Sequence, residues 1–171
     1  KGYVPQTFCL SYTVPLLKGN CSVHSKTLSA NDFRGISISP IISKIFEHCI
    51  LHRYDMFFTS SDNQFGFKKR SGCMHAIHTF RSTVDYYVTR GSTVNVCSLD
   101  LSKAFDKMNH YGLFVKLMDR RISVNLLKVL ELWFTSSATC VKWGTFFSSF
   151  YRLSCGVRQG MCFHLICLPF I

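Results

Sequence analysis

The stretch of this sequence that decides its fold is SLDLSKAFDKMNH, residues 98–110. The segment leading into it, TVNVCSLDL at residues 93–101, is short and rich in β-branched residues, and Gly91 bounds it on one side. This composition predicts a buried strand that ends at Asp100. An acid at the end of a buried strand is unusual, because burial removes water from its charge, and it needs an explanation. A bland alternative is that Asp100 caps the following turn.

Helical periodicity surrounds this stretch on both sides. Upstream, apolar residues recur at helical spacing over residues 41–58 and again over residues 74–91. We expect the first of these helices to be amphipathic and to bury its apolar positions, which are Ile41, Ile42, Ile45, Phe46, Cys49, Ile50 and Tyr54. Downstream, residues 102–121 and 123–137 give two more helical patterns, with Ser123 placed to cap the second.

Strand signals lie near both ends of the chain. The first forty residues contain several prolines and a polar stretch, which predict short strands and a long loop. Residues 138–155 alternate around Gly144 as a hairpin does. Because the helices and strands do not alternate regularly, we predict an α+β fold.

The charge of the chain points to a polyanionic partner. Lys and Arg number 20 against 9 acids, which gives a net charge of +11 spread along the whole sequence. A surface of this kind favours nucleic acid as the partner, although a basic protein without one is the alternative. A membrane is not favoured, because every apolar run is interrupted by a basic residue or histidine before it could span one.

Cysteine and histidine patterns indicate neither a disulfide framework nor a metal-binding motif. The nine cysteines are odd in number and form no CxxC pair, and no signal peptide is present. We interpret all nine as reduced core thiols of an intracellular protein. The pairs His48 with His52 and His75 with His78 lie one helical turn apart but lack a third ligand, so we expect ordinary histidines.

The segment SLDLSKAFDKMNH resembles the first palm motif of reverse transcriptases of non-LTR, LINE-type retrotransposons. In that motif a strand ends in an acid, and an aromatic residue follows five residues later. The resemblance implies that Asp100 is catalytic and holds two Mg²⁺ ions, and that Phe105 blocks the ribose 2′-hydroxyl of a nucleotide. The chemistry agrees, because nucleotidyl transfer needs two hard cations held by carboxylates.

A second match lies in VPLLKGN, from Val14, and NDFRGISISPIISKIFEHCI, from Asn31, which are similar to the family's fingers segment. It implies that Lys18 and Arg34 reach the incoming triphosphate, whose charge cations would neutralise. The alternative for each is a solvated side chain. Gly35 stands where the family has Pro.

A third match is the fingers loop SSDNQFGFKKRSG, which begins at Ser60 and contains the family's Gln-Phe-Gly-Phe run. The resemblance implies that Lys68, Lys69 and Arg70 contact the template backbone. Basic side chains beside aromatic rings suit nucleic acid. The alternative is a solvated basic loop.

A fourth match is GVRQG at residues 156–160, which is similar to the palm motif Gly-Val-Pro-Gln-Gly. By this resemblance Gln159 and Gly160 contact the nucleotide. Arg158 stands where the family has Pro.

Taken together, the resemblance implies a fingers-like subdomain at residues 1–92 and a partial palm at residues 93–171. The intact parent would copy RNA into DNA, with an RNA template, a DNA primer and dNTPs as partners, in a nuclear or cytoplasmic ribonucleoprotein. The family's next element carries two adjacent aspartates, and this sequence contains no Asp-Asp pair. We therefore expect the chain to stop before that hairpin and the thumb, and to be inactive alone. A non-catalytic nucleic-acid-binding remnant and an unrelated basic α+β protein are the alternatives.

Overall fold

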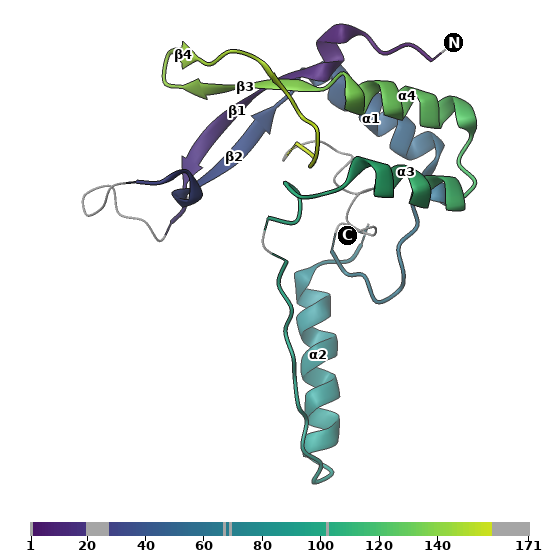
Figure 1. The fold of residues 1–171 in the computed structure, drawn as a ribbon. Coiled ribbons are helices and arrows are strands. Elements are labelled where there is room, and N and C mark those ends of the chain that lie inside the picture. The colour runs from purple at the N-terminus through teal and green to yellow at the C-terminus, as the bar shows by residue number, and fades with distance from the viewer. Residues whose placement is uncertain (1, 20–27, 67, 69, 102, 159–171) are drawn as a thin grey trace. The chain divides into compact units, whose positions relative to one another are not determined.

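The computed structural model describes residues 2–19, 28–66, 68, 70–101 and 103–158. The chain divides into two compact units (Figure 1). The first unit comprises Lys1–Phe58 together with Ala104–Ile171, and the second unit is Thr59–Lys103. This division differs from the expected boundary between residues 92 and 93, which concerns polymerase subdomains and stays a prediction.

Helices and strands mix without a regular alternation, in agreement with an α+β fold (Figure 1). The first unit begins with the 3-10 helix η1 (Gln6–Cys9), β1 (Leu10–Leu17), the 3-10 helix η2 (Ala30–Asp32), β2 (Phe33–Ile38), α1 (Ile41–Arg53) and the 3-10 helix η3 (Asp55–Phe57). It continues with α3 (His110–Asp119), α4 (Val124–Thr135), β3 (Ala138–Trp143), β4 (Phe146–Phe147) and β5 (Tyr151–Arg152). The second unit contains α2 (Cys73–Val88).

The five strands form one sheet in the order β2-β1-β3-β4, with β5 also paired to β3. Strand β1 runs antiparallel to β2 and parallel to β3, while β4 and β5 run antiparallel to β3. The expected short strands and the hairpin around Gly144 are therefore confirmed, and Gly144 adopts a φ of 59° in the turn. The sheet joins the start of the chain to a segment 128 residues later.

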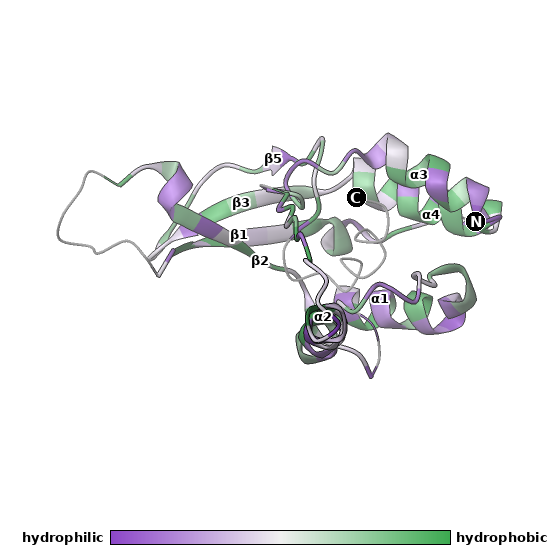
Figure 2. Cartoon of the chain, turned by 90° about the horizontal axis from the view of Figure 1, so that it is seen from below, coloured by the Kyte–Doolittle hydropathy of each residue, from purple (hydrophilic) through white to green (hydrophobic). Residues whose placement is uncertain are grey.

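The hydrophobic core of the first unit lies where α3 and α4 meet the start of the chain. Both helices carry green and purple bands in Figure 2, as amphipathic helices do. Leu117, Leu130 and Trp133 are at most 2% exposed. The Trp133 ring stacks on Phe46 of α1 at 5.5 Å between centroids, and its Nε1 donates to Phe8 O at 3.2 Å.

The expected cap of α4 is confirmed, whereas α3 begins at His110, later than the helical pattern of residues 102–121 predicts. Ser123 Oγ accepts a hydrogen bond from Leu126 N at 3.4 Å, which caps α4. Asn109 Oδ1 accepts from Tyr111 N at 2.9 Å and from Gly112 N at 3.3 Å, which caps α3. Each side chain satisfies amide groups that lack a partner in the first turn of a helix.

Helix α1 buries only part of the apolar face expected, since Ile50 is buried and Phe46 and Tyr54 pack against the core. The expected core positions Ile41, Ile42 and Ile45 are 76%, 65% and 56% exposed. The buried positions are Ser43, Glu47 and Ile50. Apolar spacing shows that a helix is amphipathic, but it did not reveal that the Glu47 carboxylate interacts electrostatically with a buried arginine, Arg158. That partner lies on the face the helix buries.

The expected buried strand at residues 93–101 is wrong. This segment of the second unit has no regular secondary structure and is mostly exposed, with Val96 at 59% and Leu99 at 89%. A strand requires a neighbour that completes its hydrogen-bond ladder. None of the five strands that the structure describes pairs with this segment, so β-branched composition alone does not make it a strand.

The cysteines agree only in part with the expected core thiols. Six of them lie in the described ranges, and all six are free thiols. Cys9 and Cys140 are buried, whereas Cys49, Cys73, Cys97 and Cys155 are exposed, so the core assignment is wrong for these four. Among the residues that the structure describes, no helix is both long and apolar enough to cross a membrane.

Candidate functional site

Two of the sequence motifs meet in the first unit. Val157 N donates a hydrogen bond to Phe105 O at 2.8 Å, and Gly156 N donates to Met108 O at 2.8 Å. His110 Nε2 lies 2.7 Å from Gly156 O and secures the same turn. The segment that follows Asp100 is therefore held against the start of GVRQG by three hydrogen bonds.

A glycine is required where these two segments touch. Gly156 has a φ of +77°, a conformation that other residues rarely adopt. A Cβ atom on it would lie 2.7 Å from Asp106 O and 2.8 Å from Phe105 O, and both are backbone atoms that cannot swing aside. The close approach of the two motifs thus depends on Gly156.

The two residues expected to reach the triphosphate share one face of the β1–β2 hairpin. Leu16 pairs with Arg34 in the ladder, and Lys18 N donates to Asp32 O at 2.9 Å just beyond it. Because side chains alternate along a strand, Lys18 and Arg34 project from the same face. Both are exposed, and Lys18 Nζ donates to Asn31 O at 2.6 Å. Their contact with a triphosphate stays a prediction.

Gly35 replaces the family's Pro without leaving a gap. A Cβ atom at this position would lie 2.9 Å from Thr13 Cγ2. The Thr13 side chain is held in place, because its Oγ1 lies 3.1 Å from both Ser37 Oγ and Thr139 Oγ1. The methyl group of Thr13 therefore occupies the space that a larger residue at position 35 would need.

Asp100 and Phe105 fall in different units. Asp100 is exposed in the second unit, and Phe105 is half-buried against the core of the first. No three histidine, cysteine or acidic side chains among the described residues come together as a metal site. A single carboxylate does not satisfy a hard divalent cation, so these residues do not by themselves fit a two-metal centre. The metal-binding role of Asp100 stays a prediction, as does the sugar-selecting role of Phe105.

The basic loop lies in the second unit. Lys68 Nζ lies 3.4 Å from Asp62 Oδ1, an exposed ion pair of the kind that contributes little to stability. Arg70 is exposed and has a φ of 60°. Lys69 lies outside the described residues, as do Gln159 and Gly160 of the last motif.

Arg158 is the residue whose position the sequence did not indicate. It is only 3% exposed, and its Nη2 donates hydrogen bonds to Cys9 O and, at 3.2 Å, to Ala138 O. Burial lowers the pKa of Arg158, while electrostatic interactions with Cys9 and Glu47 oppose this effect. The guanidinium joins the starts of β1 and β3 to the motif turn. The sequence showed only that Arg158 stands where the family motif has Pro. This substitution does not predict that the arginine is buried.

Comparison with known proteins places this chain among polymerases. A family model described as reverse transcriptase (RNA-dependent DNA polymerase) matches residues 19–163. A probable RNA-directed DNA polymerase from transposon X-element of Drosophila melanogaster is 26% identical over 135 residues, which are 75% of this chain and 14% of that protein. The RNA-directed DNA polymerase from mobile element jockey of Drosophila funebris is 25% identical over 166 residues, which are 93% of this chain and 17% of that protein.

The chain thus spans less than one fifth of the length of these two relatives. Both relatives come from mobile elements, as the resemblance to retrotransposon enzymes predicts. The family match covers the joined turns of Phe105 and Val157 and the cations Arg34 and Lys68. On this match, which extends over most of its length, the chain belongs to the reverse transcriptase (RNA-dependent DNA polymerase) family.

Proposed function

We propose that this chain forms the fingers and the first part of the palm of an RNA-directed DNA polymerase from a LINE-type retrotransposon. The observation that carries the proposal is the hydrogen-bonded junction between the turn of Phe105 and the turn of Val157. In a right-hand polymerase these turns border the same nucleotide, and here they are adjacent although 52 positions apart in the sequence (157 − 105).

Each site residue has a role in this proposal. Lys18 and Arg34 bind the triphosphate from one face of the β1–β2 hairpin, because two exposed cations there neutralise phosphate charge. Phe105 limits the space beside the sugar, and Gln159 and Gly160 contact the nucleotide. Lys68, Lys69 and Arg70 neutralise the template backbone. These roles require an RNA template, a DNA primer and dNTPs.

Reverse transcriptases use divalent metal ions, and Asp100 is the proposed ligand of this chain for Mg²⁺. Phosphoryl transfer of this type normally employs several carboxylates around two ions. Asp100 is the single acid that the motif assigns to that task, so the remaining ligands would belong to an Asp-Asp hairpin in the parent protein. We therefore propose that residues 1–171 alone do not catalyse nucleotide addition.

Binding to a primer–template tests the nucleic-acid part of the proposal. The 171-residue chain is titrated into a fluorescent RNA–DNA hybrid at several salt concentrations, with anisotropy as the readout. Each phosphate contact contributes a slope of about −0.7 to −0.9 to the logarithm of affinity against the logarithm of salt concentration. Replacing both Lys68 and Arg70, the described cations assigned to the template backbone, by Gln should flatten that slope by more than one. Lys128→Gln, an exposed cation on α4, is the matched control and should leave it unchanged.

Absence of binding at low salt, or binding without salt dependence, would overturn the proposed binding of nucleic acid by this chain. A non-catalytic nucleic-acid-binding remnant is the second candidate function, favoured by the replacement of the motif Pro by the buried Arg158. The reading frame beyond Ile171 separates these two. An aromatic-Ala-Asp-Asp hairpin there supports the polymerase, and a stop codon or frameshift supports the remnant.

A further inference from the structure

The two faces of the sheet in the first unit differ in chemistry. Tyr12 pairs with Ile38 on one side and with Cys140 on the other, so these three side chains project from the same face. The opposite face carries the hydroxyl groups of Thr13 and Thr139, which lie 3.1 Å apart. We call the first of these the aromatic face. Its members used below are Leu10, Tyr12, Ile38, Cys140, Lys142 and Phe147.

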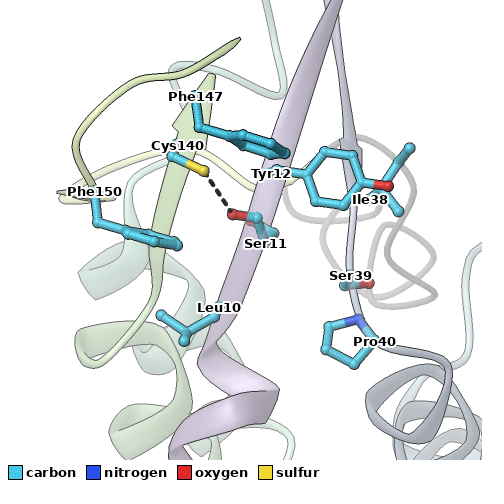
Figure 3. Close-up of a pocket in the computed structure, with 9 residues that line it drawn as sticks. All are labelled: Leu10, Ser11, Tyr12, Ile38, Ser39, Pro40, Cys140, Phe147 and Phe150. Atoms are coloured by element: carbon cyan, nitrogen blue, oxygen red, sulfur yellow. Dashed lines mark hydrogen bonds between the residues drawn. The ribbon is translucent and has the colours of Figure 1, made fainter. Parts of the chain in front are cut away.

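A pocket of about 400 Å³ opens on the aromatic face (Figure 3). Leu10, Tyr12 and Phe147 contribute to its wall, together with Phe150 from the segment after β4. Phe147 and Phe150 are each 59% exposed, so the rings are accessible from outside. The volume lies within the range of about 300 to 1,000 Å³ found for ligand pockets, and it is large enough for a nucleobase.

Positive charge accompanies these rings. Lys142 Nζ lies 5.5 Å from the centroid of the Tyr12 ring and 5.5 Å from that of Phe147, and the two rings meet edge to face at 6.2 Å. Further along the same face project Lys18 and Arg34.

An acid beside this face, Asp32, already accepts hydrogen bonds within its own turn. The Asp32 carboxylate accepts hydrogen bonds from Ser29 N at 2.8 Å and from Ser29 Oγ at 3.0 Å. The aromatic face thus presents cations and flat rings together, in a chain of net charge +11.

We propose that the aromatic face binds single-stranded RNA, with a base stacked against Phe147 in the pocket and a phosphate beside Lys142. Rings bind bases that are free of pairing partners, whereas the bases of a duplex present no stacking face. The phosphate binds the Lys142 amine, which lies 5.5 Å from the centroids of the Tyr12 and Phe147 rings. The choice of RNA over DNA rests on the function proposed above.

The test compares two neighbouring phenylalanines on one strand. Phe147 pairs with Lys142, and Phe146 pairs with Trp143, so their side chains project from opposite faces of the sheet. Both are exposed, at 59% and 78%, so replacing either by Leu keeps an apolar side chain and the fold. The probe is fluorescent oligouridine, which forms no duplex with itself, and the full 171-residue chain is used.

We expect Phe147→Leu to weaken oligouridine binding roughly 5- to 50-fold, with an unchanged salt slope, because it removes stacking and no charge. Phe146→Leu should bind like the wild type. Lys142→Gln should reduce the salt slope by about 0.7, the contribution of one phosphate on a single strand.

Equal affinity of Phe147→Leu and wild type would overturn the inference, and so would an equal loss in Phe146→Leu. A change confined to self-association, measured by light scattering, would show instead that the face binds protein. In these cases the proposed polymerase function stands if the wild type still binds the RNA–DNA hybrid. If the wild type binds neither oligouridine nor the hybrid, the proposed function itself fails.

Discussion

Gly156 meets two separate requirements, a left-handed backbone and a lack of space for any side chain. Gly144 meets only the first, since its φ is +59° and a Cβ atom added to it would have no other atom within 4 Å. The two glycines therefore allow backbone strain and steric overlap to be measured apart. The sequence predicted Gly144 at the centre of a hairpin and Gly156 at the start of a motif. It did not predict that only Gly156 lacks space for a side chain.

Gly156→Ala should destabilise the chain more than Gly144→Ala. A left-handed alanine costs about 1 kcal/mol, and overlap with the fixed backbone of Phe105 and Asp106 should add about 1 to 3 kcal/mol. Urea denaturation followed by Trp fluorescence measures both variants. Equal losses for the two would show that the contact between the motif turns is not tight.

The buried Cys9 thiol should make stability depend on pH. Burial raises the pKa of Cys9, and the nearby Arg158 charge only partly offsets this. The folded state therefore holds the thiol proton more firmly than the unfolded chain, whose cysteine pKa is about 8.5. This contribution to the free energy of unfolding is complete below about pH 8.5 and is lost as pH rises through the higher pKa of the folded state.

Urea midpoints measured from neutral pH into the alkaline range should fall for the wild type. Cys9→Ser should lose much of that fall, because serine does not titrate there. The exposed Cys49→Ser is the control and should keep it. A Cys9→Ser variant whose alkaline decline matches the wild type would rule out this thiol as the cause.

At the scale of elements, helix α1 shows which features apolar periodicity predicts and which it does not. The apolar spacing predicted the existence and start of the helix, because that spacing follows from its geometry. It was right for Ile50 and Phe46, which lie in or against the core, and wrong for Ile41 and Ile45. These two are exposed, while Glu47 is fully buried. Arg158, which interacts electrostatically with Glu47, lies more than one hundred residues away in the sequence, and no local pattern contains that information.

Removing the Arg158 charge tests the electrostatic interaction between Arg158 and Glu47. Arg158→Met removes the hydrogen bonds to Cys9 O and Ala138 O, together with a positive charge that interacts electrostatically with Glu47, and should cost about 1 to 3 kcal/mol. The double variant with Glu47→Gln should recover part of that loss, because the buried charge is gone. Arg152→Met, an exposed arginine on β5, should change the free energy of unfolding by less than about 0.5 kcal/mol. A double variant no more stable than Arg158→Met would contradict the coupling.

The pairing of β1 with β2 contains a second coupled pair. Gly35→Ala should cost about 1 to 3 kcal/mol, because its Cβ would overlap the Thr13 methyl group. Thr13→Ser removes that methyl and keeps the hydroxyl, so Gly35→Ala should be much milder in the Thr13→Ser background. A double-mutant cycle in urea measures the coupling, and Gly19→Ala, which has open space around it, is the control. Additive effects would show that the strand shifts to make room.

At the scale of the whole molecule, four short motifs in the correct order predicted the family, and the family match confirms it. The motifs worked because polymerase chemistry demands certain residue types at fixed spacing. The β-branched segment at residues 93–101 failed as a strand because a strand is defined by its neighbour, which composition does not supply. The sequence did not predict the aromatic face, because Tyr12 and Phe147 become neighbours only when their strands join one sheet.

The 171-residue chain should not extend a primer. In a primer-extension assay with an RNA template, dNTPs and Mg²⁺, product should remain at the level of Asp100→Asn, because one motif carboxylate does not hold two ions. A parent protein that includes the Asp-Asp hairpin should extend the primer and lose this activity on Asp100→Asn. Extension by the 171-residue chain above the Asp100→Asn level would contradict the expectation.

The parallel pairing of β1 with β3 has a consequence for biosynthesis. Ser11 and Thr139 are bonded across 128 positions, so β1 leaves the ribosome long before its partner is translated. Until then one edge of β1 can pair only with β2, and the other edge stays open to foreign strands. Sheets closed over such long separations form slowly, and the waiting strand is a site for chaperone capture or aggregation. The nascent chain therefore needs protection until β3 has been made.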